Sequence, residues 1–553
     1  MNSMRLAVLF LFTPILTIAQ SFDYQISAPY KVFDANEKEY FFHDNSVIAV
    51  KQDGGTTLIQ KFDVNTLKET SRKEYADHGD GFQYESINRF DDKLYLFYSV
   101  YDKPNETEQL FAREIDMTSG TFTGKGRKIV TVKSKVTNFF AGSPLISGDE
   151  GGQASGLGFM KFGVQDKFNV QTSFDKSKIL VQYRKKPTEK NDDLNKDVIG
   201  ICVFDRNLNE ISSDEIEMPY TEAKMNNLDY TIDSKGNKYI LTLIYENDKQ
   251  KLRVGGEISY HLEVIRIPVN STTLDLVPIK LKEGYINDIT VFNDKDDNMI
   301  CAGFYARGKQ GLNADGVVMF KIRPEGDLFD MHTYEIPVEV LNMYAKQREQ
   351  ERNEKKDSKD KAEFQHLRMR ELDAFDDGSI LLTGEQYYII RTTTQTSNGS
   401  KTTYTPYYNH ILAVKIGPDG NLSWMKKLGK RQKGKNYSSL MAVRQGGCSY
   451  NYFKSNNKHY FFFLDNVNNS DLSLDERPKY HQDGAGGFFT AYVLTDDKGS
   501  ISKENLFDMR DVKGIEVFQF HINRIVHISD NEFIVEVYKK KKEDMLIKVT
   551  VKV

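Results

Sequence analysis

The residue types that carry out most protein chemistry are scattered along this chain and form no recognisable catalytic motif. Neither the G-x-S-x-G sequence of a nucleophile elbow nor the H-E-x-x-H sequence of a zinc site occurs. Among the 10 histidines, His521 and His527 are the closest pair. Six residues along a strand separate two side chains by about 20 Å, which is too far to share a metal. We therefore predict no catalytic residues, no metal site and no cofactor.

Two segments have a composition found in ligand-binding loops, but neither completes a motif. Asp294–Asn298 resembles half of a calcium loop, yet it lacks the central Gly and the later bidentate Glu, so we expect a turn between strands. Gly148–Gly158 is rich in glycine, but no Gly-Lys-Ser/Thr follows it, so we expect a flexible inter-strand loop. The three cysteines lie in or beside predicted strands and are expected to be small buried core residues: Cys202, Cys301 and Cys448.

One unit recurs through the body of the chain and must position any functional side chain. Each copy has a short turn rich in Asp, Asn, Gly or Lys, followed by two apolar, β-branched or aromatic runs of strand length. A third apolar segment precedes the first run, and a fourth usually follows the second. The first runs begin at Val47, Leu94, Ile179, Tyr239, Met299, Ile380, Tyr460 and Phe533.

Four antiparallel strands in each of eight units, with hardly any helix, predict an all-β fold, namely a β-propeller of about eight four-stranded blades. A seven-bladed ring is the alternative. A chain of β-sandwiches would need about seven strands in each domain and Greek-key connections, so the four-strand period favours the propeller. The chain ends on a predicted third strand, Leu546–Val553. We expect an N-terminal strand within Phe22–Val32 to supply the missing outer strand, so that residues 20–553 form one closed domain.

Four insertions depart from the repeat: the glycine-rich segment, the charged loop Arg184–Asp197, which we expect to be solvated, and two insertions with predicted secondary structure. Val338–Glu371 contains strong helix formers such as Gln347–Lys356 and little apolar content, which predicts one charged helix over the rim. This helix is either a solvated surface element or a mobile arm that meets a partner.

Tyr387–Tyr408 predicts a long β-hairpin, because Asn398-Gly399 is a strong two-residue turn signal with mirrored flanks. The Thr-rich flanks suit strands exposed to water, so the hairpin should protrude beyond its blade. The tyrosines at its base form either a binding platform or part of the blade core. The candidate partner-binding residues are Tyr387, Tyr388, Arg391, Asn398, Gly399, Tyr404, Tyr407 and Tyr408.

Composition and the N-terminus indicate the compartment. The 553 residues include 75 Lys+Arg and 79 Asp+Glu, and the resulting net charge of −4 argues against a nucleic-acid partner. Arg5 precedes an apolar run from Leu6 to Ala19, which is shorter than the roughly 20 residues of a membrane span. This pattern predicts a secretory signal peptide at residues 1–19. The residue directly after Ala19 is Gln20 and not Cys, so we expect no lipid anchor. No later stretch of the sequence is apolar enough for a membrane span.

One blade resembles a known repeat. Ala413–Trp424 carries the spaced Ala, Gly and Trp of the quinoprotein-type propeller family. That family locks its blades together with a Trp in nearly every repeat, whereas this chain contains 1 Trp and no adjacent Cys-Cys pair. The resemblance therefore implies a propeller blade and does not extend to quinone binding.

The Ala-Gln junction and the body rich in Lys, Asn, Tyr and Phe resemble exported proteins of Bacteroidota-type Gram-negative bacteria. In size and compartment the chain also resembles the plug subunit of the type 9 secretion translocon. These resemblances imply a periplasmic protein, with an extracellular location as the alternative. We predict a non-catalytic protein-interaction propeller of the cell envelope, associated with an outer-membrane or secretion component. The alternative is a glycan-binding, peptide-binding or hydrolytic propeller with a carboxylate site in the central channel.

Overall fold

The structure is a computed structural model that describes residues 22–137, 167–186, 195–307, 313–359, 361–397, 399–438, 447–539 and 541–552. The predicted signal peptide and the glycine-rich segment Gly148–Gly158 lie outside these residues. Within the described ranges, none of the helices is both apolar enough and long enough to pass through a membrane.

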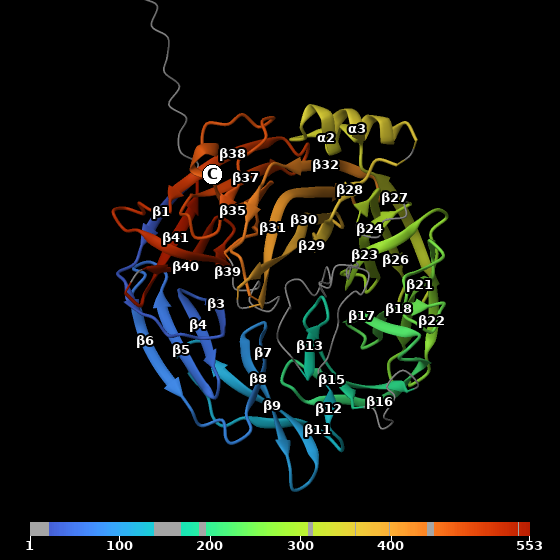
Figure 1. The fold of residues 1–553 in the computed structure, drawn as a ribbon. Helices are drawn as coiled ribbons and strands as arrows, with labels where there is room; N and C mark the ends of the chain where they lie inside the picture. Colours follow the sequence, from blue (N-terminus) through green and yellow to red (C-terminus); the bar gives the residue numbers. More distant parts are fainter. Residues whose placement is uncertain are drawn as a thin grey trace, which may run out of the picture.

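Eight sheets of at least four strands, antiparallel except for the short parallel pair β33–β36, surround a central axis, so the predicted eight-bladed β-propeller is confirmed (Figure 1). Blade 1 consists of β3 (Glu37–His43), β4 (Ser46–Asp53), β5 (Thr56–Asp63) and β6 (Glu69–Tyr75). Blade 2 consists of β7 (Gln83–Phe90), β8 (Lys93–Asp102), β9 (Thr107–Asp116), β10 (Thr121–Phe122) and β11 (Arg127–Val132). Blade 3 consists of β12 (Val136–Thr137), β13 (Phe168–Thr172), β14 (Lys178–Lys185), β15 (Lys196–Asp205) and β16 (Glu210–Thr221). Blade 4 consists of β17 (Met225–Ile232), β18 (Lys238–Tyr245), β21 (Tyr260–Ile267) and β22 (Asp275–Ile279).

The second half of the ring continues this pattern. Blade 5 consists of β23 (Tyr285–Asn293), β24 (Met299–Ala306), β26 (Gly316–Ile322) and β27 (Leu328–Glu335). Blade 6 consists of β29 (Leu367–Ala374), β30 (Ile380–Thr396), β31 (Gly399–Ile416) and β32 (Leu422–Leu428), extended by β33 (Gln432–Lys433) and β36 (His481–Gln482). Blade 7 consists of β34 (Asn451–Ser455), β35 (Lys458–Asp465), β37 (Phe488–Thr495) and β38 (Ile501–Asp508). Blade 8 consists of β39 (Val517–Ser529), β40 (Glu532–Lys539), β41 (Glu543–Val551), β1 (Phe22–Ile26) and β2 (Tyr30–Lys31).

A few short elements lie outside the blades. They are the strand pairs β19 (Arg253–Val254) with β20 (Glu257–Ile258) and β25 (Asn313–Ala314) with β28 (Phe364–Gln365), the helices α2 (Val338–Asn342) and α3 (Gln347–Asp357), and the 3₁₀ turn η4 (Val467–Asn469).

The core lies between neighbouring blades, and it explains why the second strands are so apolar. Every residue of β18 and β24 is buried, so these strands pack on both faces and show no apolar–polar alternation. Between blades 7 and 8, the rings of Phe462 and Phe533 lie 4.6 Å apart. The three cysteines are buried and unpaired, as the sequence predicted.

The two ends of the chain meet in blade 8. β1 pairs with β41 from Phe22 opposite Val551 to Ile26 opposite Ile547, and β2 continues along the same strand. Phe22 packs against the ring of Phe462 in the neighbouring blade 7, so the N-terminal strand also contributes to the core between blades 7 and 8. The outer edge of the last sheet is therefore covered by the start of the chain.

The helical insertion predicted for Val338–Glu371 is present, but it ends earlier than expected. α2 and α3 are separated by Tyr344, whose φ of 65° interrupts a right-handed helix, and α3 ends at Asp357. The chain from Phe364 onward is strand, because β28 pairs with β25 and β29 pairs with β30. These pairings are long-range contacts that local helix propensity does not reveal. Both helices lie at the outer edge of the ring beside β32 (Figure 1).

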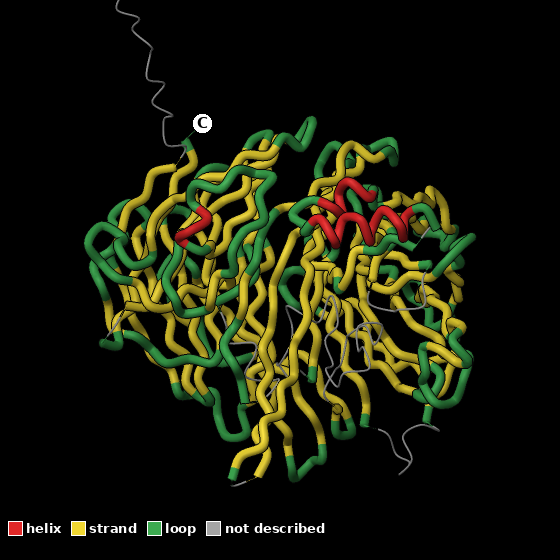
Figure 2. Tube along the Cα trace, turned by 45° about the horizontal axis from the view of Figure 1, so that its top comes forward, coloured by secondary structure: helices red, strands yellow, loops and turns green. Residues whose placement is uncertain are grey.

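The predicted hairpin is confirmed. β30 and β31 pair from Ile380 opposite Ile416 to Thr396 opposite Gly399, with one register shift between Glu385 and Tyr387, and this pairing carries both strands well past the end of their blade (Figure 2). Gly399 has a φ of 121°, a value that favours glycine at the turn.

Candidate functional site

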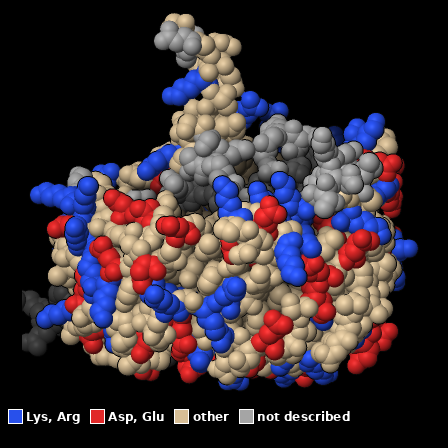
Figure 3. All heavy atoms as spheres, turned by 90° about the horizontal axis from the view of Figure 1, so that it is seen from below, with Lys and Arg blue, Asp and Glu red and all other residues tan. Residues whose placement is uncertain are grey.

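The outer part of the hairpin is a two-stranded ribbon. Among the described residues, its outermost contacts with the rest of the chain are the two backbone hydrogen bonds between Tyr404 and Tyr437, each 2.9 Å long. Arg391, which pairs with Tyr404, is exposed, as is Gly399 at the turn, and Ile390, one residue closer to the blade, is 44% exposed. Figure 3 shows this ribbon as a column that rises above one face of the disc. Within the part that the structure describes, the ribbon carries Arg391 and Lys401 and no carboxylate.

The candidate partner-binding tyrosines separate into different environments. Tyr387 and Tyr408 are only 5% and 6% exposed and pack with Cys448, so these two belong to the blade core and are inaccessible to a partner. Tyr388 and Tyr407 are half-buried and stack with ring centroids 5.0 Å apart. The structure therefore does not bring all the candidate residues to one surface.

The remaining candidates lie further out along the hairpin. Tyr404 is half-buried at the start of the ribbon, opposite the exposed Arg391, whereas Gly399 lies at the exposed turn. Asn398 lies outside the described residues.

A buried ionic network fixes the foot of the hairpin. Lys430 Nζ lies 2.6 Å from Glu385 Oε1, and both side chains are fully buried. Ser449 Oγ donates to Glu385 Oε2 at 2.7 Å, and Arg370 Nη2 donates to Ser449 Oγ at 2.7 Å. Since each group contacts an oppositely charged or hydrogen-bonding partner, this network makes the hairpin base rigid.

A β-bulge lies directly above this network. Glu385 pairs with Ile411 and Tyr387 pairs with Tyr408, so Asn409 and His410 together oppose the single residue Gln386. Successive strand residues normally point to opposite faces, but a bulge re-aims them. As a result, Asn409 and His410 both line one cavity of about 330 Å³.

This cavity, which we call the foot pocket, lies between the hairpin base and the helical insertion. Its walls come from α2, α3, β28, β30, β31, the end of β32 and the segment before β36. Aromatic rings form part of the wall: Tyr344 stacks on His410 with centroids 5.3 Å apart, and His366 contacts Tyr388 at 5.2 Å. The two features that the sequence singled out, the insertion and the base tyrosines, therefore meet here.

The foot pocket has an excess of cations. Four basic side chains line it, against the two carboxyls of Glu349 and Glu363. These four are Arg352, Lys427, Arg431 and Arg477. Burial, together with the nearby Arg477, lowers the pKa of Lys427 to about 8, although Glu349 acts in the opposite direction.

Several buried polar atoms in the foot pocket have no hydrogen-bond partner among the described residues. They are Asn409 Oδ1, His410 Nδ1, Glu363 Oε1 and Arg477 Nε. Burial, reinforced by Lys427 and Arg431, lowers the pKa of His410 well below its ordinary value, so the imidazole is neutral. No pattern in the sequence predicts this site, because its residues come from separate segments between Leu341 and Tyr480.

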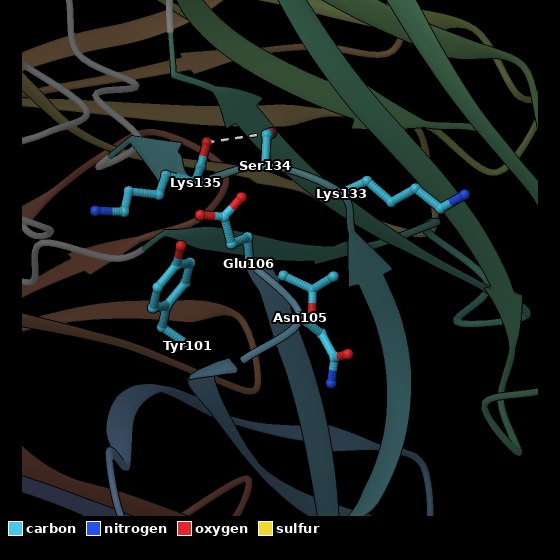
Figure 4. Close-up of a pocket in the computed structure, with 7 residues that line it drawn as sticks. Tyr101, Asn105, Glu106, Lys133, Ser134 and Lys135 are labelled. Atoms are coloured by element: carbon cyan, nitrogen blue, oxygen red, sulfur yellow. Dashed lines mark hydrogen bonds between the residues drawn. The ribbon is translucent and has the colours of Figure 1, made fainter. Parts of the chain in front are cut away.

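A second hollow lies between the tip of the β8–β9 hairpin and the β11–β12 segment (Figure 4). It measures about 500 Å³ and is lined by residues such as Tyr101, Glu106, Lys133 and Lys135. Most of these side chains are exposed, and Lys135 lies over the Tyr101 ring at 5.2 Å. Among the described residues, this hollow contains no buried polar atom that lacks a partner.

Two carboxyls on β29 form a further group that sequence reasoning could not place. Glu371 and Asp373 are two residues apart on the innermost strand of blade 6, so both side chains lie on one face of it. Burial and the neighbouring Asp373 raise the pKa of Glu371 to about 7, whereas burial raises that of Asp373 to about 6. Within the described residues, no group of three or more His, Cys, Asp or Glu side chains could hold a metal.

Comparisons with known proteins add little to this geometry. No protein-family model matches the chain, and no curated protein matches it. Among solved structures it is similar to prolyl endopeptidase, with 9% identity, 94% of this chain and 55% of that chain covered, and a TM-score of 0.38. It is also similar to a quinohemoprotein alcohol dehydrogenase of Pseudomonas putida HK5 (8% identity, 96% and 76% covered, TM-score 0.38).

A third similar structure is the β-propeller domain of the Trilobed protease of Pyrococcus furiosus, with 8% identity, 87% and 98% covered, and a TM-score of 0.34. The chain spans 55% of the length of the prolyl endopeptidase. At this level of similarity, none of the three bears on the activity of the chain.

Proposed function

We propose that this protein is a non-catalytic protein-interaction propeller of the cell envelope, a periplasmic subunit that binds an outer-membrane or secretion component through the hairpin. The observation that carries the proposal is the ribbon beyond the Tyr404–Tyr437 contacts, where residues 392–395 and 399–401 are exposed, together with Ile390, which is 44% exposed where the ribbon starts. An isolated two-stranded ribbon is only marginally stable in water, so contact with a partner would repay the cost of ordering it. Because Arg391 and Lys401 are its only charged side chains, the complementary partner surface is acidic.

The test is to replace the segment from Arg391 to Thr403 with a tight turn. The segment is almost entirely exposed, so the shortened protein is expected to melt within about 1 °C of wild type. It should no longer recover the stoichiometric outer-membrane protein that wild type recovers from native membranes.

A pair of point variants controls this experiment. Ile390→Ser on the hairpin should weaken recovery of the partner, whereas Ile211→Ser on β16, at a similar 47% exposure, should leave it unchanged. Equal recovery by the shortened and wild-type proteins would remove the hairpin from the interaction.

The carboxyls of Glu371 and Asp373 favour a second candidate, a glycan- or peptide-processing site on the innermost strands. A pair of carboxyls with raised pKa values can provide a proton donor and its conjugate base near neutral pH. A sugar or peptide that raises the melting temperature of wild type, but not of Glu371→Gln, would support this alternative over the hairpin proposal.

A further inference from the structure

We infer that the foot pocket binds a small hydroxylated organic anion, that is, a sugar-sized molecule with a phosphate or carboxylate group. This inference is independent of the hairpin proposal, because it concerns a ligand of the purified protein. It rests on the bulge, on the unpaired cations and on the unpaired acceptors, each of which points to the same class of ligand.

The bulge shows that the pocket is a built feature of the strand pair. A regular strand would send Asn409 and His410 to opposite faces, whereas here both side chains line the pocket and are 5% and 8% exposed. Bulges recur beside binding sites because they re-aim side chains in this way. Tyr344 and His366, on two other walls, have φ values of 65° and 54°, which side chains of this size rarely adopt.

The basic side chains of the foot pocket favour a ligand that carries a negatively charged group. Lys427 donates to the carbonyl of Leu341 at 2.8 Å, and Arg431 donates to the carbonyl of Pro478 at 2.9 Å. Neither forms an ion pair with a described carboxylate, and the same holds for Arg477. Glu349 acts on Lys427 without forming a direct ion pair with it. Gathering three cations that lack a direct ion pair is costly at a partly buried site, and a bound oxyanion would offset that cost.

The two carboxyls of the foot pocket, Glu349 and Glu363, do not neutralise all of its basic side chains. Arg352 lies 3.9 Å from Glu349 on α3, so this pair accounts for one cation and one anion. Glu363 Oε2 accepts from Asn313 Nδ2 at 3.0 Å, and burial raises the pKa of this carboxyl, so Glu363 provides at most one negative charge against the three remaining cations. The remaining charge of the pocket is therefore positive.

The unpaired acceptors require a ligand that also donates hydrogen bonds. Asn409 Oδ1 and Glu363 Oε1 are buried and unpaired within the described part of the chain. A buried acceptor without a donor is destabilising by about 1–3 kcal/mol, and hydroxyl groups would satisfy both atoms. The rings of Tyr388 and Tyr480 supply apolar walls, and a volume of about 330 Å³ suits a single sugar better than a bare ion.

The experiment measures binding to the purified full chain by titration calorimetry and by thermal shift. The probes are glucose 6-phosphate, glucuronate, inorganic phosphate and glucose. We expect at least one of the two sugar anions to bind about tenfold more tightly than both phosphate and glucose. Preference for glucose 6-phosphate identifies phosphate as the recognised group, and preference for glucuronate identifies carboxylate.

Variants then locate the binding. Arg477→Gln and His410→Gln should each weaken binding about tenfold or more, whereas Arg477→Lys should retain most of it. Lys135→Gln, which removes one charge from the other hollow, is the matched control and should bind like wild type. Arg477 is half-exposed in a loop, so its variants should fold, and circular dichroism checks this.

Three results would overturn the inference. The first is the absence of binding by either sugar anion at about 10 mM. The second is binding of glucose or phosphate as tight as that of the sugar anions. The third is binding that survives both Arg477→Gln and His410→Gln, or that falls equally in Lys135→Gln.

Discussion

At the scale of single residues, buried carboxyls on the inner strands join one blade to the next. Glu85 on β7 accepts from the backbone N–H groups of Lys167 and Phe168, at 2.7 and 3.1 Å, where the next blade begins. Asp288 on β23 accepts from the N–H of Met369 at 2.8 Å, in the same relation to the following blade. These contacts leave the carboxyls deeply buried, so their ionisation is coupled to folding.

Glu85 should make the protein less stable as the pH rises. Burial raises its pKa from 4.5 to about 7, despite opposing hydrogen bonds from Ser99 and Phe168. Between about pH 4.5 and 7 the folded state therefore holds a proton that the unfolded state has released, and stability falls through this window as pH increases. In Glu85→Gln the amide oxygen can accept from the two N–H groups, and the NH2 group can donate to Ser99 Oγ, all without a charge. Its melting temperature should therefore fall less than that of wild type between pH 5 and 8.

The comparison needs an exposed control. Glu351→Gln on α3 changes the same functional group on an exposed surface and should follow the wild-type slope. If Glu85→Gln and wild type lose stability in parallel across this range, Glu85 is not the group responsible.

At the scale of elements, the ring is closed by an ionic cluster as well as by strand pairing. Lys51 on β4 lies 2.5 Å from Glu536 on β40, and Tyr30 and Tyr40 both donate to the same carboxylate. Burial alone would raise the pKa of Glu536, but Lys51, together with Lys38 and Arg524, lowers it to about 2. Blade 1, the N-terminal segment and blade 8 therefore share one buried charge.

Glu536→Gln should weaken this closure strongly. It removes the carboxylate nearest to Lys51 and leaves Asp544, 3.6 Å away, as the remaining partner. Leaving a buried charge with no partner typically costs about 3–5 kcal/mol, so we expect a loss of about 2–3 kcal/mol here. Glu543→Gln on β41 removes an exposed partner of Lys539 and should cost less than about 1 kcal/mol. Chemical denaturation at pH 7 measures both, and equal losses would show that the cluster has no special role.

Some secondary-structure elements of this fold could be predicted from the sequence, and others could not. The central strands were predictable because runs such as Met299–Ala306 are apolar on both faces. The hairpin was predictable because the turn at Gly399 has a local signal. The end of the helical insertion was not, because the strand beginning at Leu367 depends on pairing with β30.

The foot pocket was beyond sequence reasoning for a related reason. A bulge such as the one at Asn409 and His410 has no composition of its own, since it arises from how two strands align. Lys427 and Arg477 approach it from separate segments, and only the folded ring brings them together. The candidate residues on the hairpin were visible because they are contiguous in sequence, although the structure buries Tyr387 and Tyr408.

At the scale of the whole molecule, the integrity of the disc depends on the N-terminal strand. Deleting Phe22–Val32 would expose the edge of β41 and remove Phe22 from the core between blades 7 and 8. We expect the deleted protein to melt at a lower temperature and to form concentration-dependent aggregates, because an unpaired apolar edge binds other strands. Light scattering across a concentration series measures this, and a monomeric variant with the wild-type melting temperature would contradict it.

The meeting of the two chain ends also sets the order in which the molecule can be made. Ser27 bonds to Leu546 across 519 residues of sequence, so the last sheet cannot be completed until these two distant segments meet. The central strands of the other seven blades pair with near neighbours in sequence, so these blades can form earlier. Until the last sheet closes, the first strand has no partner, and an unpaired strand is prone to aggregation. During refolding, we therefore expect the segment 22–26 to be the last of the described strands to gain protection against amide hydrogen exchange.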